Sequence, residues 1–139
     1  HWAEMALAHG SAMSLENPGS SMLWDMPSVL QFIASVGGQV ILLDMCAFGT
    51  EYKKPTKFLH VPMFLQGLAR LCPGSHHHVE LSGKIVLDSG KEVWATKLAQ
   101  EYPVPLCERY AELACAALLP SGQEAWLCAQ APTFFHEVG

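Results

Sequence analysis

Hydrophobic residues recur at helical spacing in several parts of the chain. The spacing predicts four helices, over residues 1–9, 26–37, 63–72 and 104–119. Gly10 and Gly37 end the first two, as glycine commonly does at helix C-termini. The last is the most regular, because Leu106, Tyr110 and Leu113 fall on one stripe. Gly67 weakens the prediction for the third.

Shorter apolar runs between these helices predict strands over residues 12–16, 39–46 and 57–61. The run at 39–46 is continuously aliphatic, which favours a strand covered on both faces, with 57–61 as its antiparallel neighbour. Residues 75–91 have the rhythm of a hairpin, with turn pairs at Ser82-Gly83 and Ser89-Gly90. Strands alternating with helices predict a layered α/β domain.

Composition limits the class of protein. Half of the 139 residues are hydrophobic and 15% are charged, which argues against disorder and fits one domain or part of one. No apolar run is long enough for a membrane span, and residues 1–10 do not resemble a signal peptide. The chain starts at His1 within a predicted helix, so we expect it to be cut from a longer one. Five cysteines without a CxxC pair favour reduced thiols in an intracellular protein.

The net charge of −5 argues against a free-standing nucleic-acid-binding protein. Basic residues are unevenly placed, however, because Lys53, Lys54 and Lys57 fall close together. With Thr56 they are suitable donors to phosphate oxygens on the rim of a hairpin. The alternative is a solvated turn whose lysines protect a sheet edge.

The stretch "LENPGSS" places Glu16, Asn17 and Pro18 where the first predicted strand ends. A carboxylate at a strand end can accept hydrogen bonds from a base or an amine, and proline would fix the direction of the backbone. The alternative is that Glu16 or Asn17 caps an ordinary turn.

Four stretches in order carry a family resemblance: "ENPGSSMLW", "DMCAFG", "YKKPTKFL" and "YPVPLC". Together they resemble the C-terminal half of a compact branch of the cytosine-5 DNA methyltransferases found in phage and in mobile-element polyproteins. The resemblance covers roughly residues 1–118. It implies a partial doubly wound, Rossmann-like α/β sheet with an antiparallel edge hairpin and flanking helices over residues 1–119. For the tail at 120–139 the residue pattern itself predicts one short helix.

The resemblance also implies roles for individual residues. Glu16 would hydrogen-bond the ring edge of a flipped-out cytosine, with Asn17 orienting the adjacent loop. Lys54, Thr56 and Lys57 would support the catalytic loop and the target base, and Tyr102-Pro103 would close the site of the cofactor, S-adenosylmethionine. In this chemistry a cysteine thiolate attacks carbon 6 of the base, and carbon 5 then takes the methyl group.

The chain departs from the family at two essential points. It lacks the Pro-Cys nucleophile motif, since "LCPG" at Cys72 has the reverse order, and no glycine-rich cofactor turn precedes His1. We therefore expect the isolated chain to be inactive, with DNA and a missing N-terminal half-domain as partners. A truncated sheet with an apolar edge would also favour self-association. The alternatives are a non-catalytic nucleic-acid-binding or structural segment of a mobile-element polyprotein, or a small zinc-stabilised interaction domain.

The stretch "CPGSHHHVE" suggests a metal site. His76 and His78 point to the same side of an extended segment that follows Cys72, and Cys46 and Cys107 could lie near them in space. Two thiolates and two imidazoles would make a tetrahedral zinc site. The alternative is a surface histidine cluster beside a buried cysteine, because no second ligand pair has zinc-finger spacing.

Overall fold

The computed structural model describes residues 2–118. Its main sheet consists of β1 (Met13–Pro18), β2 (Gln39–Asp44) and β3 (Pro55–Val61), and a separate hairpin pairs β4 (Lys84–Val86) with β5 (Glu92–Trp94). Three α-helices accompany them, α1 (Trp2–Ala8), α2 (Pro27–Val36) and α3 (Val104–Leu118). Short 3-10 turns complete the chain: η1 (Met22–Asp25), η2 (Met45–Phe48), η3 (Gln66–Leu68) and η4 (Ala95–Ala99).

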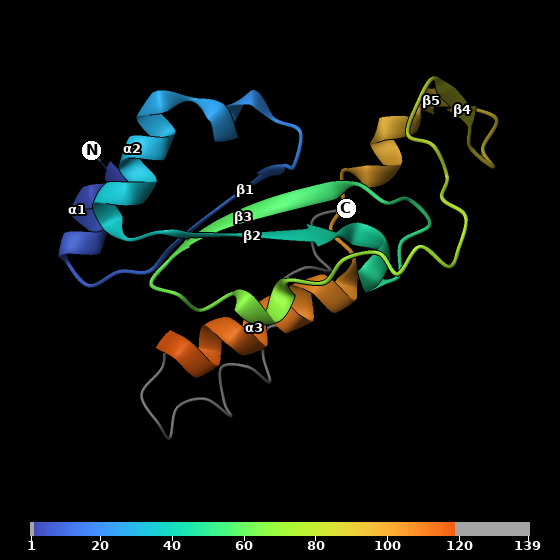
Figure 1. Cartoon of the computed structure of the whole chain (residues 1–139). Helices are drawn as coiled ribbons and strands as arrows, with labels where there is room; N and C mark the ends of the chain where they lie inside the picture. The colour runs from blue at the N-terminus through green and yellow to red at the C-terminus, as the bar shows by residue number, and fades with distance from the viewer. Residues whose placement is uncertain (1, 119–139) are drawn as a thin grey trace.

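The sheet is antiparallel throughout, so the expected doubly wound parallel sheet is wrong. Its order is β1-β3-β2, and both β1 and β2 pair antiparallel with β3. β1 and β2 therefore run in the same direction on either side of β3, linked through α2 (Figure 1). The antiparallel pairing of residues 39–44 with 55–60 is confirmed, but β3 is the central strand. β2 runs parallel to β1 but does not pair with it, because β3 lies between them.

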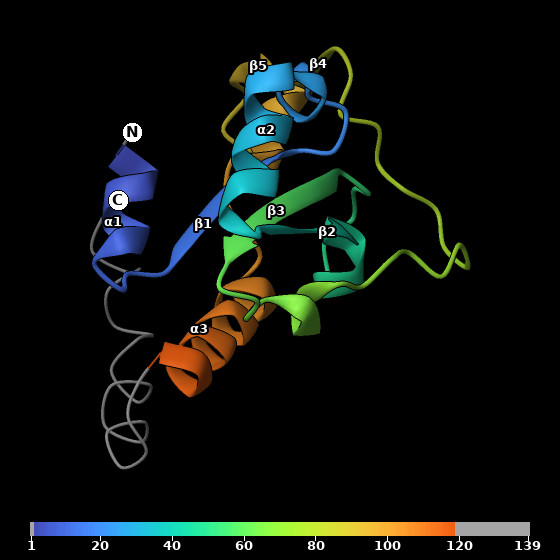
Figure 2. The ribbon, with the colours of Figure 1, turned by 60° about the vertical axis from the view of Figure 1, so that its left-hand side comes forward.

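Helices cover the two faces of this sheet unequally. α2 lies over one face and α3 over the other (Figures 1 and 2). The hydrophobic core lies mainly on the α3 face, where Ile41, Phe58 and Leu106 belong to one buried cluster with η3. No residue of α2 is fully buried. The α3 face is therefore the well-packed one, and functional side chains on it have the more rigid support.

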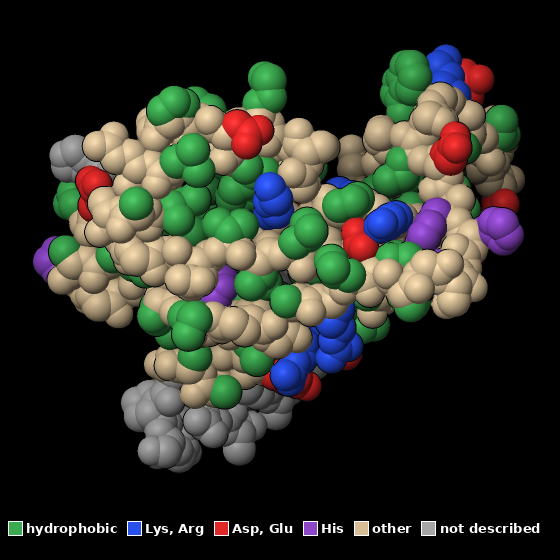
Figure 3. Space-filling model, viewed as in Figure 1, with side chains coloured by type: hydrophobic (Ala, Val, Ile, Leu, Met, Phe, Trp, Pro, Cys, Tyr) green, Lys and Arg blue, Asp and Glu red, His purple; other side chains and the backbone are tan. Residues whose placement is uncertain are grey.

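β2 is half exposed, which corrects the expectation of a strand covered on both faces. Val40 and Leu42 are 40% and 41% exposed, whereas Ile41 and Leu43 are buried in the core. Hydrophobic side chains gather over this part of the surface in Figure 3. An edge strand needs only one covered face, so a continuous aliphatic run does not distinguish it from a central parallel strand. Self-association through this region stays a prediction.

The helices predicted at 26–37 and 104–119 match α2 and α3, and that at 1–9 matches α1 within the described residues. The helix predicted at 63–72 is wrong, because only the turn η3 forms there. At Gly67 a Cβ would lie 3.0 Å from side-chain atoms of both Arg109 and Leu113, so this segment lies very close to α3. The segment is shaped by its contact with α3. The short helix expected at 120–139 lies outside the described residues.

Within residues 2–118, no helix combines the length and the hydrophobicity needed to cross a lipid bilayer.

Candidate functional site

Glu16 lies on the face of β1 that packs toward α3. It pairs in register with Phe58 of β3, and β1 continues to Pro18, so Glu16 stands within the strand and not after its end. The Tyr102 hydroxyl donates a 2.6 Å hydrogen bond to Glu16 Oε2. The other oxygen, Oε1, is buried and has no hydrogen-bond partner among the described residues. The Glu16 carboxylate is thus fixed through Oε2, and Oε1 can still accept a hydrogen bond.

Tyr102 joins this carboxylate to a lysine. Burial, followed by the hydrogen bond to Glu16 and its charge, raises the pKa of Tyr102 well above its ordinary value, so the hydroxyl stays a donor. The Lys54 ammonium lies 5.9 Å from the centre of the Tyr102 ring and donates a 2.8 Å hydrogen bond to the Ala99 carbonyl. Glu16, Lys54 and Tyr102, from three separate stretches of the sequence, therefore form one cluster, called here the Glu16 cluster.

The backbone at Lys54 is strained. Its φ of 31° is the only positive value at a non-glycine residue in the described part of the chain, and the residue precedes Pro55. Thr56, fully buried, donates a 3.2 Å hydrogen bond from Oγ1 to the Lys54 carbonyl and helps to hold this conformation. Strain of this kind persists only where neighbouring contacts enforce it.

An open hollow of about 450 Å³ adjoins Lys54. Pro18, two residues after Glu16 on the same strand face, lines one side, and Thr96, Ala99 and Gln100 from around η4 line another. The walls of the hollow are partly polar, and neither Glu16 nor Tyr102 is among the residues that line it.

The other residues singled out in the sequence do not join the Glu16 cluster. Lys53 lies 3.7 Å from Asp44, and Lys57 lies 5.8 Å from the ring centre of Trp24, on the α2 face of the sheet. Asn17 is half buried on that same face. The Pro103 carbonyl accepts the Leu106 N–H at 2.9 Å in the first turn of α3. The lysines therefore do not form one basic patch.

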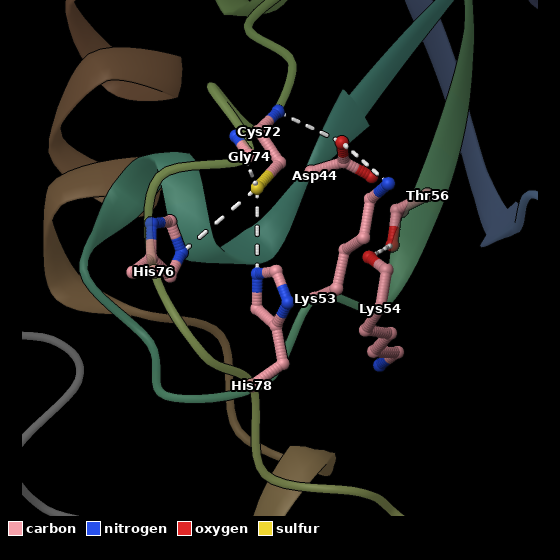
Figure 4. A network of polar contacts seen from close by, with 8 residues as sticks. All are labelled: Asp44, Lys53, Lys54, Thr56, Cys72, Gly74, His76 and His78. Carbon is pink, nitrogen blue, oxygen red and sulfur yellow. Dashed lines mark hydrogen bonds and ion pairs between the residues drawn. The ribbon is translucent and has the colours of Figure 1, made fainter.

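A second cluster lies where η2 meets the irregular segment 69–83. Cys46 comes from η2, and Cys72, His76 and His78 come from the segment; Figure 4 shows the latter three side chains. Burial first, then the Cys72 side chain, raises the pKa of the Cys46 thiol to about 11. Cys107, the alternative partner considered from the sequence, lies on α3 and is not part of this group. No local signal distinguished the two cysteines, because only the long-range path of the chain decides which one approaches Cys72.

Comparisons with protein-family models, with curated proteins and with solved structures give no match for this chain.

Proposed function

We propose that this chain is the base-holding part of a DNA cytosine-5-methyltransferase-like domain, with Glu16 as the residue that binds the base. The single observation that supports this most is the Glu16–Tyr102 pair, because it joins two of the motifs on which the resemblance depends. A third motif contributes Lys54 through its position over the Tyr102 ring. The proposal concerns base binding and assigns no methyl transfer to this chain.

The chemistry of cytosine suits the free oxygen of Glu16. The ring edge of cytosine offers the N4 amine, and N3 as well when it is protonated, and both donate to a carboxylate. Oε1 is buried and unpaired, so a donor placed there would satisfy it. Because Tyr102 already fixes Oε2, little side-chain freedom would be lost on binding.

Partners follow from the same proposal. Residues that lie outside residues 1–139 would supply the nucleophilic thiol and the site for S-adenosylmethionine, and Tyr102 and Pro103 would face that site only in the complete domain. DNA would meet Lys53, Lys54 and Lys57 at separate points. We place the protein inside the cell, in a mobile-element setting, on the resemblance and on the cysteine usage alone.

Binding to oligonucleotides tests the proposal. The full chain would be titrated with a labelled duplex carrying an unpaired cytosine and with the same duplex carrying uracil, whose O4 would face the carboxylate. We expect cytosine to be preferred by about tenfold, as for one well-made hydrogen-bonded contact to a base edge. Glu16→Gln should remove the preference. Glu108→Gln, which makes the same charge change on the exposed surface of α3, should keep it.

Two outcomes would reject base recognition. One is equal affinity for cytosine and uracil with a steep dependence on salt, which would identify a non-specific nucleic-acid-binding segment. The other is no binding by the folded chain, as monitored by circular dichroism.

A further inference from the structure

We propose that Cys46, Cys72, His76 and His78 form a zinc centre. The four ligand atoms all lie within 4.8 Å of one another. Cys72 Sγ lies 3.4 Å from His78 Nε2 and 3.9 Å from His76 Nε2. Ligand atoms on a tetrahedral zinc ion lie roughly 3.3–3.8 Å apart, as follows from zinc–sulfur bonds of about 2.3 Å and zinc–nitrogen bonds of about 2.0–2.1 Å. Small adjustments of side chains would therefore complete the site.

The donor set selects the metal. Two sulfur and two nitrogen ligands suit zinc and exclude calcium and magnesium, which take oxygen ligands. Two thiolates also neutralise the charge of a divalent ion. Four protein ligands leave no open position for a substrate or an activated water, so the centre would be structural.

Two backbone hydrogen bonds fix the position of Cys72. Gly74 directs its N–H to Cys72 Sγ at 3.3 Å, in a turn that requires the positive φ of 74° at this glycine. The Cys72 N–H donates in turn to Asp44 Oδ2 at 2.8 Å (Figure 4). Asp44 is buried at the end of β2, and Lys53 lies 3.7 Å from the same oxygen. Asp44 is a positioning residue, because it fixes the backbone that carries the ligand.

The segment that the metal would bind is held to the rest of the chain by a few separate contacts and not by regular secondary structure. Residues 69–83 contain no helix or strand, and irregular segments of this length are uncommon in compact domains. Its backbone hydrogen bonds to the rest of the chain include those of the Arg70 carbonyl, which accepts the Asp44 N–H at 2.9 Å, and of the Val79 N–H, which donates to the Glu51 carbonyl at 2.8 Å. Near its end the Gly83 carbonyl accepts the Ala95 N–H at 3.0 Å, and Leu81 packs against the hydrophobic core. A zinc ion bound by Cys46 and by the three ligands of the segment would connect the segment to η2. η2 is part of the core, which contains Met45 and Phe48. Metal binding would then contribute directly to the stability of the domain.

Cobalt substitution tests the centre in the full chain. Metal-free protein would be titrated with Co²⁺ and then with Zn²⁺. We expect one equivalent of Co²⁺, intense visible bands typical of a tetrahedral site, a thiolate charge-transfer band, and displacement by one equivalent of Zn²⁺. His78→Asn should weaken zinc binding by more than about 100-fold, beyond the range for supporting residues around a metal. Cys46→Ser should remove part of the thiolate band.

Two matched controls come from the chain itself. His77→Asn changes the exposed middle histidine of the same run, and Cys107→Ser changes a half-buried thiol outside the cluster; both should bind zinc like the parent. Cys46 is buried, so Cys46→Ser can misfold. His78 is only half buried, so His78→Asn tests the site without that complication. Equal loss with His77→Asn and His78→Asn, or cobalt spectra without a thiolate band, would overturn the proposal. So would the failure of folded, metal-free protein to take up either ion.

Discussion

The Tyr102 hydroxyl donates a 2.6 Å hydrogen bond to Glu16 Oε2, although the two residues are 86 positions apart. This contact joins the segment before α3 to the first strand of the sheet. It lies beside Lys54, whose ammonium stands over the Tyr102 ring. The resemblance assigned Glu16 to binding the base and Tyr102 to closing the cofactor site, and the structure joins these two residues by a hydrogen bond.

Replacing Tyr102 by phenylalanine should remove this hydrogen bond and keep the ring. We expect the free energy of unfolding to fall by about 1 kcal/mol, as for a single hydrogen bond, and the preference for cytosine to fall with it. Tyr110→Phe is the matched control, because the Tyr110 hydroxyl makes a 2.6 Å hydrogen bond with Ser14 Oγ on the same sheet face. It should cost similar stability and leave the cytosine preference intact. Denaturant unfolding and oligonucleotide titration measure the two effects, and equal loss of preference in both variants would contradict the assignment.

Asp44→Asn should weaken zinc binding without removing a ligand. Asparagine keeps an acceptor for the Cys72 N–H but loses the charge beside Lys53, so we expect affinity to fall by about 10–100-fold. Lys53→Gln should have a smaller effect, because the Lys53 side chain is 50% exposed and its ion pair is screened by solvent. Competition with a chromophoric chelator measures both affinities. Unchanged affinity in Asp44→Asn would show that the carboxylate does not position Cys72.

His60 should make the stability depend on pH. It is fully buried, and its Nδ1 accepts the N–H groups of Phe64 and Leu65 at 3.0 and 3.3 Å, which requires a neutral ring. Burial lowers the pKa of His60 from 6.5, and the nearby Pro62 carbonyl acts more weakly in the opposite direction.

Because the folded-state pKa is lowered, the unfolded chain binds the proton more readily than the folded one. The stabilising contribution is present above about pH 6.5 and is lost as the pH falls from there through the folded-state pKa. Urea unfolding of the parent and of His60→Gln at several pH values in this range measures this contribution. The difference between their free energies of unfolding cancels the effect of the other histidines. An identical pH profile for the two proteins would contradict the prediction, and NMR titration of the imidazole gives the pKa directly.

Gly38→Ala should destabilise the fold. A Cβ at this position would lie 2.7 Å from Leu59 Cδ1, and Leu59 of the central strand β3 is fully buried. We expect a loss of about 1–3 kcal/mol in the free energy of unfolding, as for overpacking elsewhere. Gln31→Ala, an exposed change on α2, should stay within about 0.5 kcal/mol of the parent. Thermal and denaturant unfolding compare them, and equal stability of both variants would show that Leu59 can move aside.

Local patterns in the sequence predicted α1, α2 and α3, and the antiparallel pairing of residues 39–44 with 55–60. These helices and this strand pair depend on contacts between residues that are close in the sequence. The periodicity of hydrophobic residues and the placement of glycine indicate such contacts directly. The histidine run and Cys72 were visible for the same reason, since three ligands within one short segment form a local pattern.

The tertiary structure alone decided the rest. A continuous aliphatic run can have parallel or antiparallel neighbours, so the sequence could not place β3 between β1 and β2. Whether Cys46 or Cys107 approaches Cys72 depends on how η2 and the 69–83 segment meet in space. The contact between Glu16 and Tyr102 likewise depends on the packing of α3 under the sheet, which long-range burial determines and no short motif encodes.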